Sequence, residues 1–153
     1  MELNVTFQDI VKARKALEGR VIHTPLIHST ILSNEVESNV WFKMESLQKT
    51  GSFKVRGALN KLDSLTEDEL NKGVITASAG NHAQGLAYAS SLKNVSAKIV
   101  VPVTTPETKL QGIKRLGGDL IVHGATYDEA EEYALHLAKE TGRVFVNAFE
   151  DDQ

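Results

Sequence analysis

The chain has 153 residues, of which 41% are hydrophobic and 24% charged, with a formal net charge of −3, a composition typical of one globular domain or slightly more. No basic stripe offsets the negative charge, so nothing favours a nucleic-acid partner, and without cysteine the chain forms neither disulfides nor thiolate metal sites. Since no apolar run has the length of a membrane span and the five histidines are scattered, we expect a cytoplasmic protein with no metal and no membrane partner.

The first part of the chain predicts short elements of mixed type. Thr6 and Asp9 have the spacing of a capping box, and Gly19 follows as a helix stop. Thr66, which precedes an acidic first turn, marks the start of another short helix. In chain order we predict a helix over 7–17, a helix over 29–36, a strand over 40–44, a helix over 52–62 and a short helix between 66 and 73.

From residue 74 onward, strands and helices alternate regularly. Strands are predicted over 74–77, 97–101, 120–123 and 144–147, and the helices between them over 81–92, 106–116 and 127–141. This alternation is typical of βαβ units, so the sequence predicts an α/β fold with a mostly parallel sheet and flanking helices. We divide the chain into 1–72 with its irregular elements, a small αβ domain at 73–149, and the start of a further segment at 150–153.

The most informative motif is Thr50-Gly51-Ser52-Phe53-Lys54-Val55-Arg56-Gly57. It places the amine of Lys54 at the start of a helix, where free N–H groups oppose a positive charge. Most lysines at such positions are solvated surface residues, but here Gly51 and Gly57 permit close backbone approach and Phe53 adds an aromatic face.

A reactive amine needs a specific environment. Near neutral pH it requires a pKa of roughly 7–8 instead of about 10.4, and a helix terminus supplies only about 0.3–1 kcal/mol toward this. We expect burial, a nearby cation such as Arg56, or capture as an imine to supply the rest.

A second motif, Ser78-Ala79-Gly80-Asn81-His82-Ala83-Gln84-Gly85, follows the predicted strand at 74–77. It lacks the glycine spacing of a dinucleotide fingerprint and the Lys-Ser/Thr pair of a P-loop. A tight strand-to-helix turn alone would explain its glycine and its capping residue. However, Ser78, Asn81 and His82 also bring a hydroxyl, an amide and an imidazole to the free N–H groups of the next helix. The motif therefore predicts a cradle for a small carboxylate or phosphate.

Together these motifs resemble the N-terminal part of the threonine/serine dehydratases, which are pyridoxal phosphate (PLP) enzymes of fold type II, a group that also includes serine racemase. The resemblance covers essentially the whole chain and is strongest over 43–58 and 78–85. It implies that 1–72 belongs to the larger PLP domain and that 73–149 is the small domain. It also implies that 150–153 begins the return to the large domain.

The resemblance implies a role for each matching residue. Lys54 matches the lysine that binds PLP covalently and moves the Cα proton, Phe53 the aromatic residue beside the pyridine ring, and Asn81 the residue that hydrogen-bonds the 3′-oxygen. The loop that closes over the substrate carboxylate matches Ser78, Gly80, Asn81 and His82. The implied reaction converts L-threonine or L-serine into a 2-oxo acid and ammonia.

One residue bears on the choice of reaction within the family. Serine racemases carry a second serine where this chain has Ala79, so the resemblance favours elimination over racemisation. The glycine run that holds the PLP phosphate and the partner of the pyridine nitrogen have no counterpart in these 153 residues, so we expect weak PLP binding and no useful turnover from this chain alone. Family members are often homo-oligomers.

Three alternatives remain open at this point. The chain could belong to a serine racemase-like PLP enzyme. The segment after residue 72 could instead be a non-catalytic αβ module that binds a small anion or nucleotide, with Lys54 as a surface charge. A third alternative is a partial chain that folds poorly and leaves apolar surface uncovered.

Overall fold

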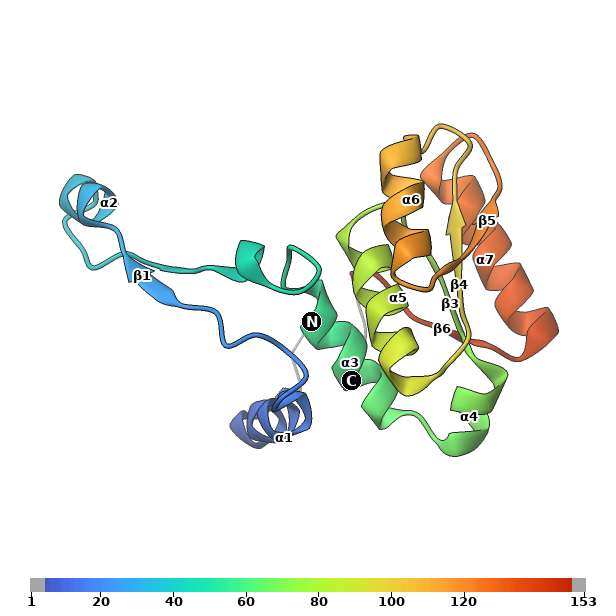
Figure 1. The fold of residues 1–153 in the computed structure, drawn as a ribbon, viewed down its shortest axis with the longest axis horizontal. Helices are drawn as coiled ribbons and strands as arrows, with labels where there is room; N and C mark the ends of the chain where they lie inside the picture. Colours follow the sequence, from blue (N-terminus) through green and yellow to red (C-terminus); the bar gives the residue numbers. More distant parts are fainter. Residues whose placement is uncertain (1–4, 150–153) are drawn as a thin grey trace.

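The computed structural model describes residues 5–149 and consists of an αβ body with an arm that projects from it (Figure 1). The body is built on a four-stranded sheet of β3 (Val74–Ala77), β4 (Ala97–Val101), β5 (Asp119–Val122) and β6 (Val144–Phe145). All three pairings are parallel, which confirms the predicted α/β fold. The segment predicted at 150–153 lies outside the described residues.

The strand order β5-β4-β3-β6 reverses next to β3. From β3 the chain moves outward through β4 to β5 on one side and then returns to place β6 on the other side. Ligands of open α/β sheets bind outside the carboxyl ends of the strands at such a reversal, because the two connections diverge there and leave a crevice. The fold thus points to the ends of β3 and β6.

The two faces of the sheet carry separate clusters of apolar side chains, as the period of two along a strand requires. Val74, Ile99 and Val101 face a cluster shared with α5 (Asn81–Lys93), α6 (Glu107–Arg115) and α3 (Lys54–Ser64). Ile75, Ala77 and Val100 face the other cluster, which is shared with α7 (Tyr127–Thr141). Figure 1 shows α7 alone on one side of the sheet and α5 and α6 on the opposite side.

Helix α3 packs outside α5 and joins the body to the N-terminal elements. Of the eleven residues of α1 (Phe7–Leu17), only Leu17 is buried, in the cluster it shares with α3. The capping box of Thr6 and Asp9 is present as predicted. The short helix α4 (Glu67–Lys72) leads from α3 into β3 and also begins with a capping box, formed by Thr66 and Glu69.

The arm contains β1 (Leu26–His28), α2 (Thr30–Glu35), β2 (Trp41–Lys43) and the 3₁₀ turn Glu45–Leu47. Strand β1 pairs with β2 in an antiparallel ribbon, and every residue of both strands is exposed. The sequence did not predict β1, because three residues between Pro25 and Ser29 are too few to show alternation. Within residues 5–149, no helix is both long and apolar enough to cross a membrane.

Candidate active site

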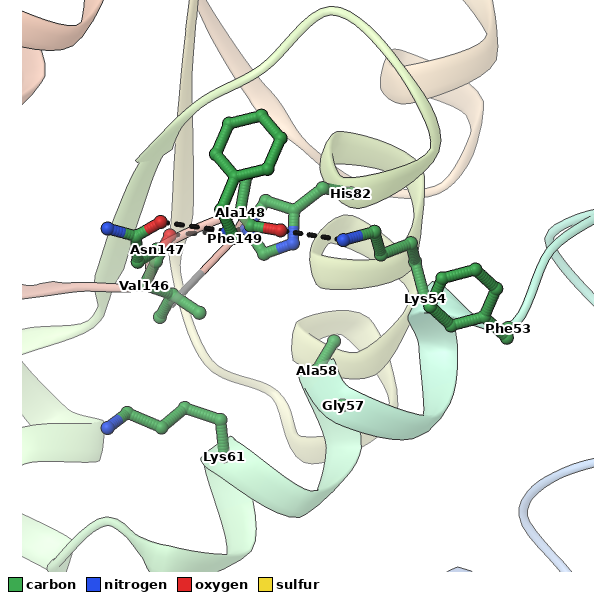
Figure 2. A pocket seen from close by; sticks show the side chains of 10 residues that line it. All are labelled: Phe53, Lys54, Gly57, Ala58, Lys61, His82, Val146, Asn147, Ala148 and Phe149. Carbon is green, nitrogen blue, oxygen red and sulfur yellow. Dashed lines mark hydrogen bonds between the residues drawn. The ribbon is translucent and has the colours of Figure 1, made fainter. Parts of the chain in front are cut away.

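A cavity of about 200 Å³ lies at the reversal point of the sheet (Figure 2). The first two turns of α3, the first turn of α5 and the segment that follows β6 form its walls. The lining residues are Phe53, Lys54, Gly57, Ala58, Lys61, His82, Val146, Asn147, Ala148 and Phe149. The cavity therefore combines both sequence motifs with a third segment.

Lys54 is half-buried at the first position of α3. Its Nζ donates a hydrogen bond of 2.6 Å to the carbonyl oxygen of Ala148. The ring centroids of Phe53 and Phe149 lie 5.5 Å and 5.9 Å from Nζ, within cation–π range. Figure 2 shows the side chain of Lys54 reaching across the cavity toward the segment after β6. The amine thus sits among aromatic faces and a carbonyl group.

His82 is the second residue of α5 and only 8% exposed. Its Nε2 lies 3.2 Å from the carbonyl oxygen of Val146, to which an N–H at that atom donates. The contact ties the first turn of α5 to the residue after β6 and holds the imidazole in the lining of the cavity. Lys54 and His82, one from each sequence motif, therefore line the same cavity.

The other residues predicted for the site lie in the loop between β3 and α5. Ser78 is buried, and its Oγ accepts a 3.2 Å hydrogen bond from the N–H of Gly80. Gly80 is the N-cap of α5 and supplies no side-chain cap, while Asn81 is the exposed first residue of that helix. None of these three lines the described cavity, although they adjoin His82. Their assigned contacts with cofactor and substrate stay predictions.

Sequence reasoning missed the residues that follow β6. Asn147, Ala148 and Phe149 line the cavity, because β6 pairs with β3 and ends at the same edge of the sheet. The strand was predicted through residue 147, whereas it ends at Phe145. The signal that could have identified them was their place after a parallel strand. Similarly, Ala58 and Lys61 follow Lys54 at helical spacing and share its face.

The sequence suggested Arg56 as a nearby cation for Lys54, but in the structure Arg56 is paired with another residue. Its Nε and Nη2 each donate a 2.8 Å hydrogen bond to the carboxylate of Glu45. This pairing, with a further hydrogen bond from the Thr24 hydroxyl, lowers the pKa of Glu45 to about 2. Arg56 therefore fastens the base of the arm to α3 instead of acting on the amine.

The groups around the cavity suit PLP. A primary amine can capture its aldehyde, and the rings of Phe53 and Phe149 offer apolar faces to a flat heterocycle. The thirteen-residue helix α5 follows its N-cap Gly80, which offers no side-chain cap, so the first N–H groups of the helix can meet an anion. By contrast, nowhere in residues 5–149 do three or more histidine or carboxylate side chains form a group that could hold a metal ion.

Comparison with known proteins agrees with a site for PLP. Residues 17–153 match the family described as pyridoxal-phosphate dependent enzymes. The L-threonine ammonia-lyase of Thermotoga maritima is 45% identical over 147 residues, which cover 96% of this chain and 37% of that protein. The catabolic L-threonine dehydratase of Staphylococcus aureus is 43% identical over 148 residues, covering 96% of this chain and 43% of that protein.

Solved structures show the same relationship. The processed threonine deaminase isoform 2 of Solanum lycopersicum superimposes with a TM-score of 0.87 at 42% identity, covering 95% of this chain and 40% of that one. Maize serine racemase superimposes with a TM-score of 0.88 at 33% identity, covering 96% and 45%. This chain therefore spans less than half of the length of these four proteins. On its sequence and its fold, the chain belongs to the family of pyridoxal-phosphate dependent enzymes.

Proposed function

We propose that this chain supplies the lysine-bearing part of a PLP-dependent ammonia-lyase that converts L-threonine or L-serine into a 2-oxo acid and ammonia. The observation that carries the proposal is the placement of Lys54 and His82 in one cavity at the reversal point of a parallel sheet. The relatives named as threonine ammonia-lyase and threonine dehydratase support L-threonine as a substrate.

The residues of this chain would divide the work. Bound PLP supplies an electron sink for the pair left on Cα when its proton leaves. Lys54 Nζ would hold the cofactor before the substrate binds and, once free of it, would accept the Cα proton; for both roles the amine must give up its hydrogen bond with Ala148. The N-terminus of α5, with Ser78, Gly80, Asn81 and His82, binds and orients the substrate carboxylate. Asn81 would in addition contact the 3′-oxygen of the cofactor, and Phe53 would lie beside its ring.

The side chain of Ala79 supports elimination over racemisation. It packs against the apolar cluster beneath α5 and carries no group that could deliver a proton to Cα. Racemisation needs such a group on the face opposite the lysine. A serine racemase activity is therefore the second candidate, favoured only by the resemblance to solved racemases. Chiral analysis of L-serine incubations with the enzyme distinguishes the two, because only racemisation yields D-serine.

The division of the chain, its partners and its location belong to the same proposal. We assign 1–72 to the cofactor-binding part, 73–149 to the small domain with the carboxylate loop, and 150–153 to the return toward the cofactor-binding part. The substrate is a small amino acid, the assembly is a homo-oligomer and the location is the cytoplasm. The exposed apolar residues of the arm support an assembly through this surface.

The proposal is tested by reductive trapping. The 153-residue chain is incubated with PLP, reduced with borohydride, digested and mapped by mass spectrometry. We expect one dominant pyridoxyl label on Lys54, which disappears in Lys54→Ala. Lys61→Ala is the matched control, because Lys61 lies on the same helix and lines the same cavity. Retention of the label in this control shows that the site discriminates between two lysines of one cavity.

The outcome separates the enzyme from a non-catalytic anion-binding module. Labels spread evenly over exposed lysines, unchanged in Lys54→Ala, would refute the assignment of Lys54. Added L-threonine should give no steady formation of 2-oxobutanoate by this chain alone, since it spans 37% of a relative that bears the activity in its name. Sustained product formation would contradict that expectation and show that these residues suffice.

A further inference from the structure

Helices α3 and α5 approach each other closely at Gly85. A Cβ placed there would lie 3.0 Å from the carbonyl carbon of Lys54, 3.1 Å from its carbonyl oxygen and 3.1 Å from the backbone nitrogen of Val55. All three neighbours are backbone atoms at the start of α3, so no side-chain rotation could relieve the crowding. The backbone that bears the reactive lysine thus rests directly on the helix that bears His82.

The conformation of Gly85 does not require glycine. The residue lies inside α5 and is absent from the glycines that adopt a positive φ. Glycine in the interior of a helix costs roughly 0.5–1 kcal/mol relative to alanine, so the position works against helix stability. The tight contact with α3 is the feature that explains a glycine here.

Gly112 provides a comparison within the same molecule. It also lies inside a helix, α6, with a φ outside the positive range. A Cβ at Gly112 would meet only the side-chain end of Gln84, at 3.8 Å, which is an ordinary van der Waals distance. The two glycines therefore differ in whether an added methyl group would meet backbone.

The contact has a direct consequence for the site. Gly85 follows His82 by three residues on α5, so both lie on one face of the helix. His82 is itself anchored to Val146 after β6. The distance between the backbone of α3 and Gly85 thus sets how far Lys54 lies from His82 and from the segment after β6.

We propose that Gly85 is a positioning residue for Lys54: it lets the first turn of α3 pack closely enough against α5 for the amine to reach the cavity. This inference rests on the proposed role of Lys54. Alanine at this position must move the backbone of Lys54 outward by a few tenths of an ångström. A misplacement of about 1 Å can cost a reactive group about 100-fold, so we expect a loss of about tenfold here.

The test measures the rate of reductive trapping of PLP at Lys54 in the 153-residue chain and in its Gly85→Ala and Gly112→Ala variants. In each digest the label on Lys54 is divided by that on Lys139, an exposed lysine of α7. This ratio corrects for differences in PLP concentration and reduction efficiency, which affect both lysines alike, and it is compared only among variants that remain folded. Gly85→Ala should lower the ratio about tenfold, and Gly112→Ala should leave it within twofold.

A second measurement needs no variant and holds even where Gly85→Ala fails to fold. Amide resonances of the unsubstituted chain are compared before and after trapping. The Gly85 amide should shift on modification of Lys54, whereas the Gly112 amide should stay in place.

Each outcome has a separate meaning. An unchanged Lys54 to Lys139 ratio in folded Gly85→Ala, or a Gly85 amide that does not move, overturns the positioning role while leaving the proposed function intact. Failure of the unsubstituted chain to label Lys54 instead overturns the proposed function itself.

Discussion

The hydrogen bond of Lys54 goes to a backbone carbonyl and not to a carboxylate. Nζ donates to Ala148, whose carbonyl has a second lone pair and lies in a partly exposed segment. A hydrogen bond between a charged group and a carbonyl contributes about 1.5–3 kcal/mol, which is less than the roughly 3–5 kcal/mol that breaking a buried ion pair costs. The amine can therefore leave Ala148 for a carbonyl compound at a lower energetic cost than it could leave a buried carboxylate, which suits a nucleophile.

Among the described residues, Glu45 has the most strongly lowered pKa. Its pKa falls from 4.5 to about 2, chiefly through the hydrogen bonds from Arg56. Because the folded pKa lies below the unfolded one, the pair stabilises the protein fully above about pH 4.5 and loses this contribution as the pH falls toward 2. The carboxylate is mostly covered, with 16% of its side chain exposed, so the ion pair is only weakly screened.

Glu45→Gln should lower the free energy of unfolding by about 1–3 kcal/mol at pH 7, since hydrogen bonds to a charged acceptor become neutral. The difference from the unsubstituted chain should be constant above about pH 5 and shrink toward pH 2. Urea unfolding at a series of pH values measures it. Glu132→Gln, at an exposed position of α7, is the control and should change stability little. A difference that grows on acidification would contradict the assignment.

At the scale of the elements, α7 depends on its N-cap. The hydroxyl of Thr126 accepts a 3.3 Å hydrogen bond from the N–H of Glu129, in the first turn of this fifteen-residue helix. Ala130 and Ala134 from the same helix are fully buried against the sheet. Loss of the cap therefore weakens the only helix that covers this face within the described residues.

Thr126→Ala should destabilise the chain by about 0.5–2 kcal/mol, because one N–H of the first turn loses its acceptor. Thr126→Ser keeps the hydroxyl and should stay within a few tenths of a kcal/mol of the unsubstituted chain. Chemical denaturation of the three proteins measures both effects. If the serine variant is destabilised as much as the alanine variant, the methyl group of Thr126 and not its hydroxyl stabilises the helix.

The elements that the sequence predicted well carry their signals locally. The strand at 97–101 has the predicted bounds because its buried β-branched run lies within the segment. The helix at 127–141 has them because a capping threonine and a glycine stop border it directly. The cavity could not be predicted in the same way, because it depends on contacts between residues that are far apart in the sequence: Lys54 and Ala148 are 94 positions apart. The strand β1 and the pairing of Arg56 with Glu45 likewise depend on the arm folding back, which no local pattern encodes.

At the scale of the whole molecule, the arm exposes an unusual amount of apolar surface. Ile31 is 80% exposed, Trp41 53% and Phe42 46%, on elements that contact little of the body (Figure 1). A two-stranded ribbon such as β1 and β2 is marginally stable alone in water. Exposed apolar side chains on such an arm suit an interaction surface, and a second copy of the chain offers the same surface in return.

We expect the 153-residue chain to self-associate through the arm, and Ile31→Asp to weaken this association at least tenfold. Burial of an isoleucine side chain contributes about 1.5–3 kcal/mol, which Asp would remove. Asp near the N-terminus of α2 also suits the helix, so folding should be preserved. Sedimentation velocity over a concentration series measures the dissociation constant.

Val103→Asp is the control, because Val103 is 63% exposed but lies in the body after β4. Equal weakening by both variants would show that association follows general surface hydrophobicity, and a monomer at all concentrations would show that the arm does not pair with itself.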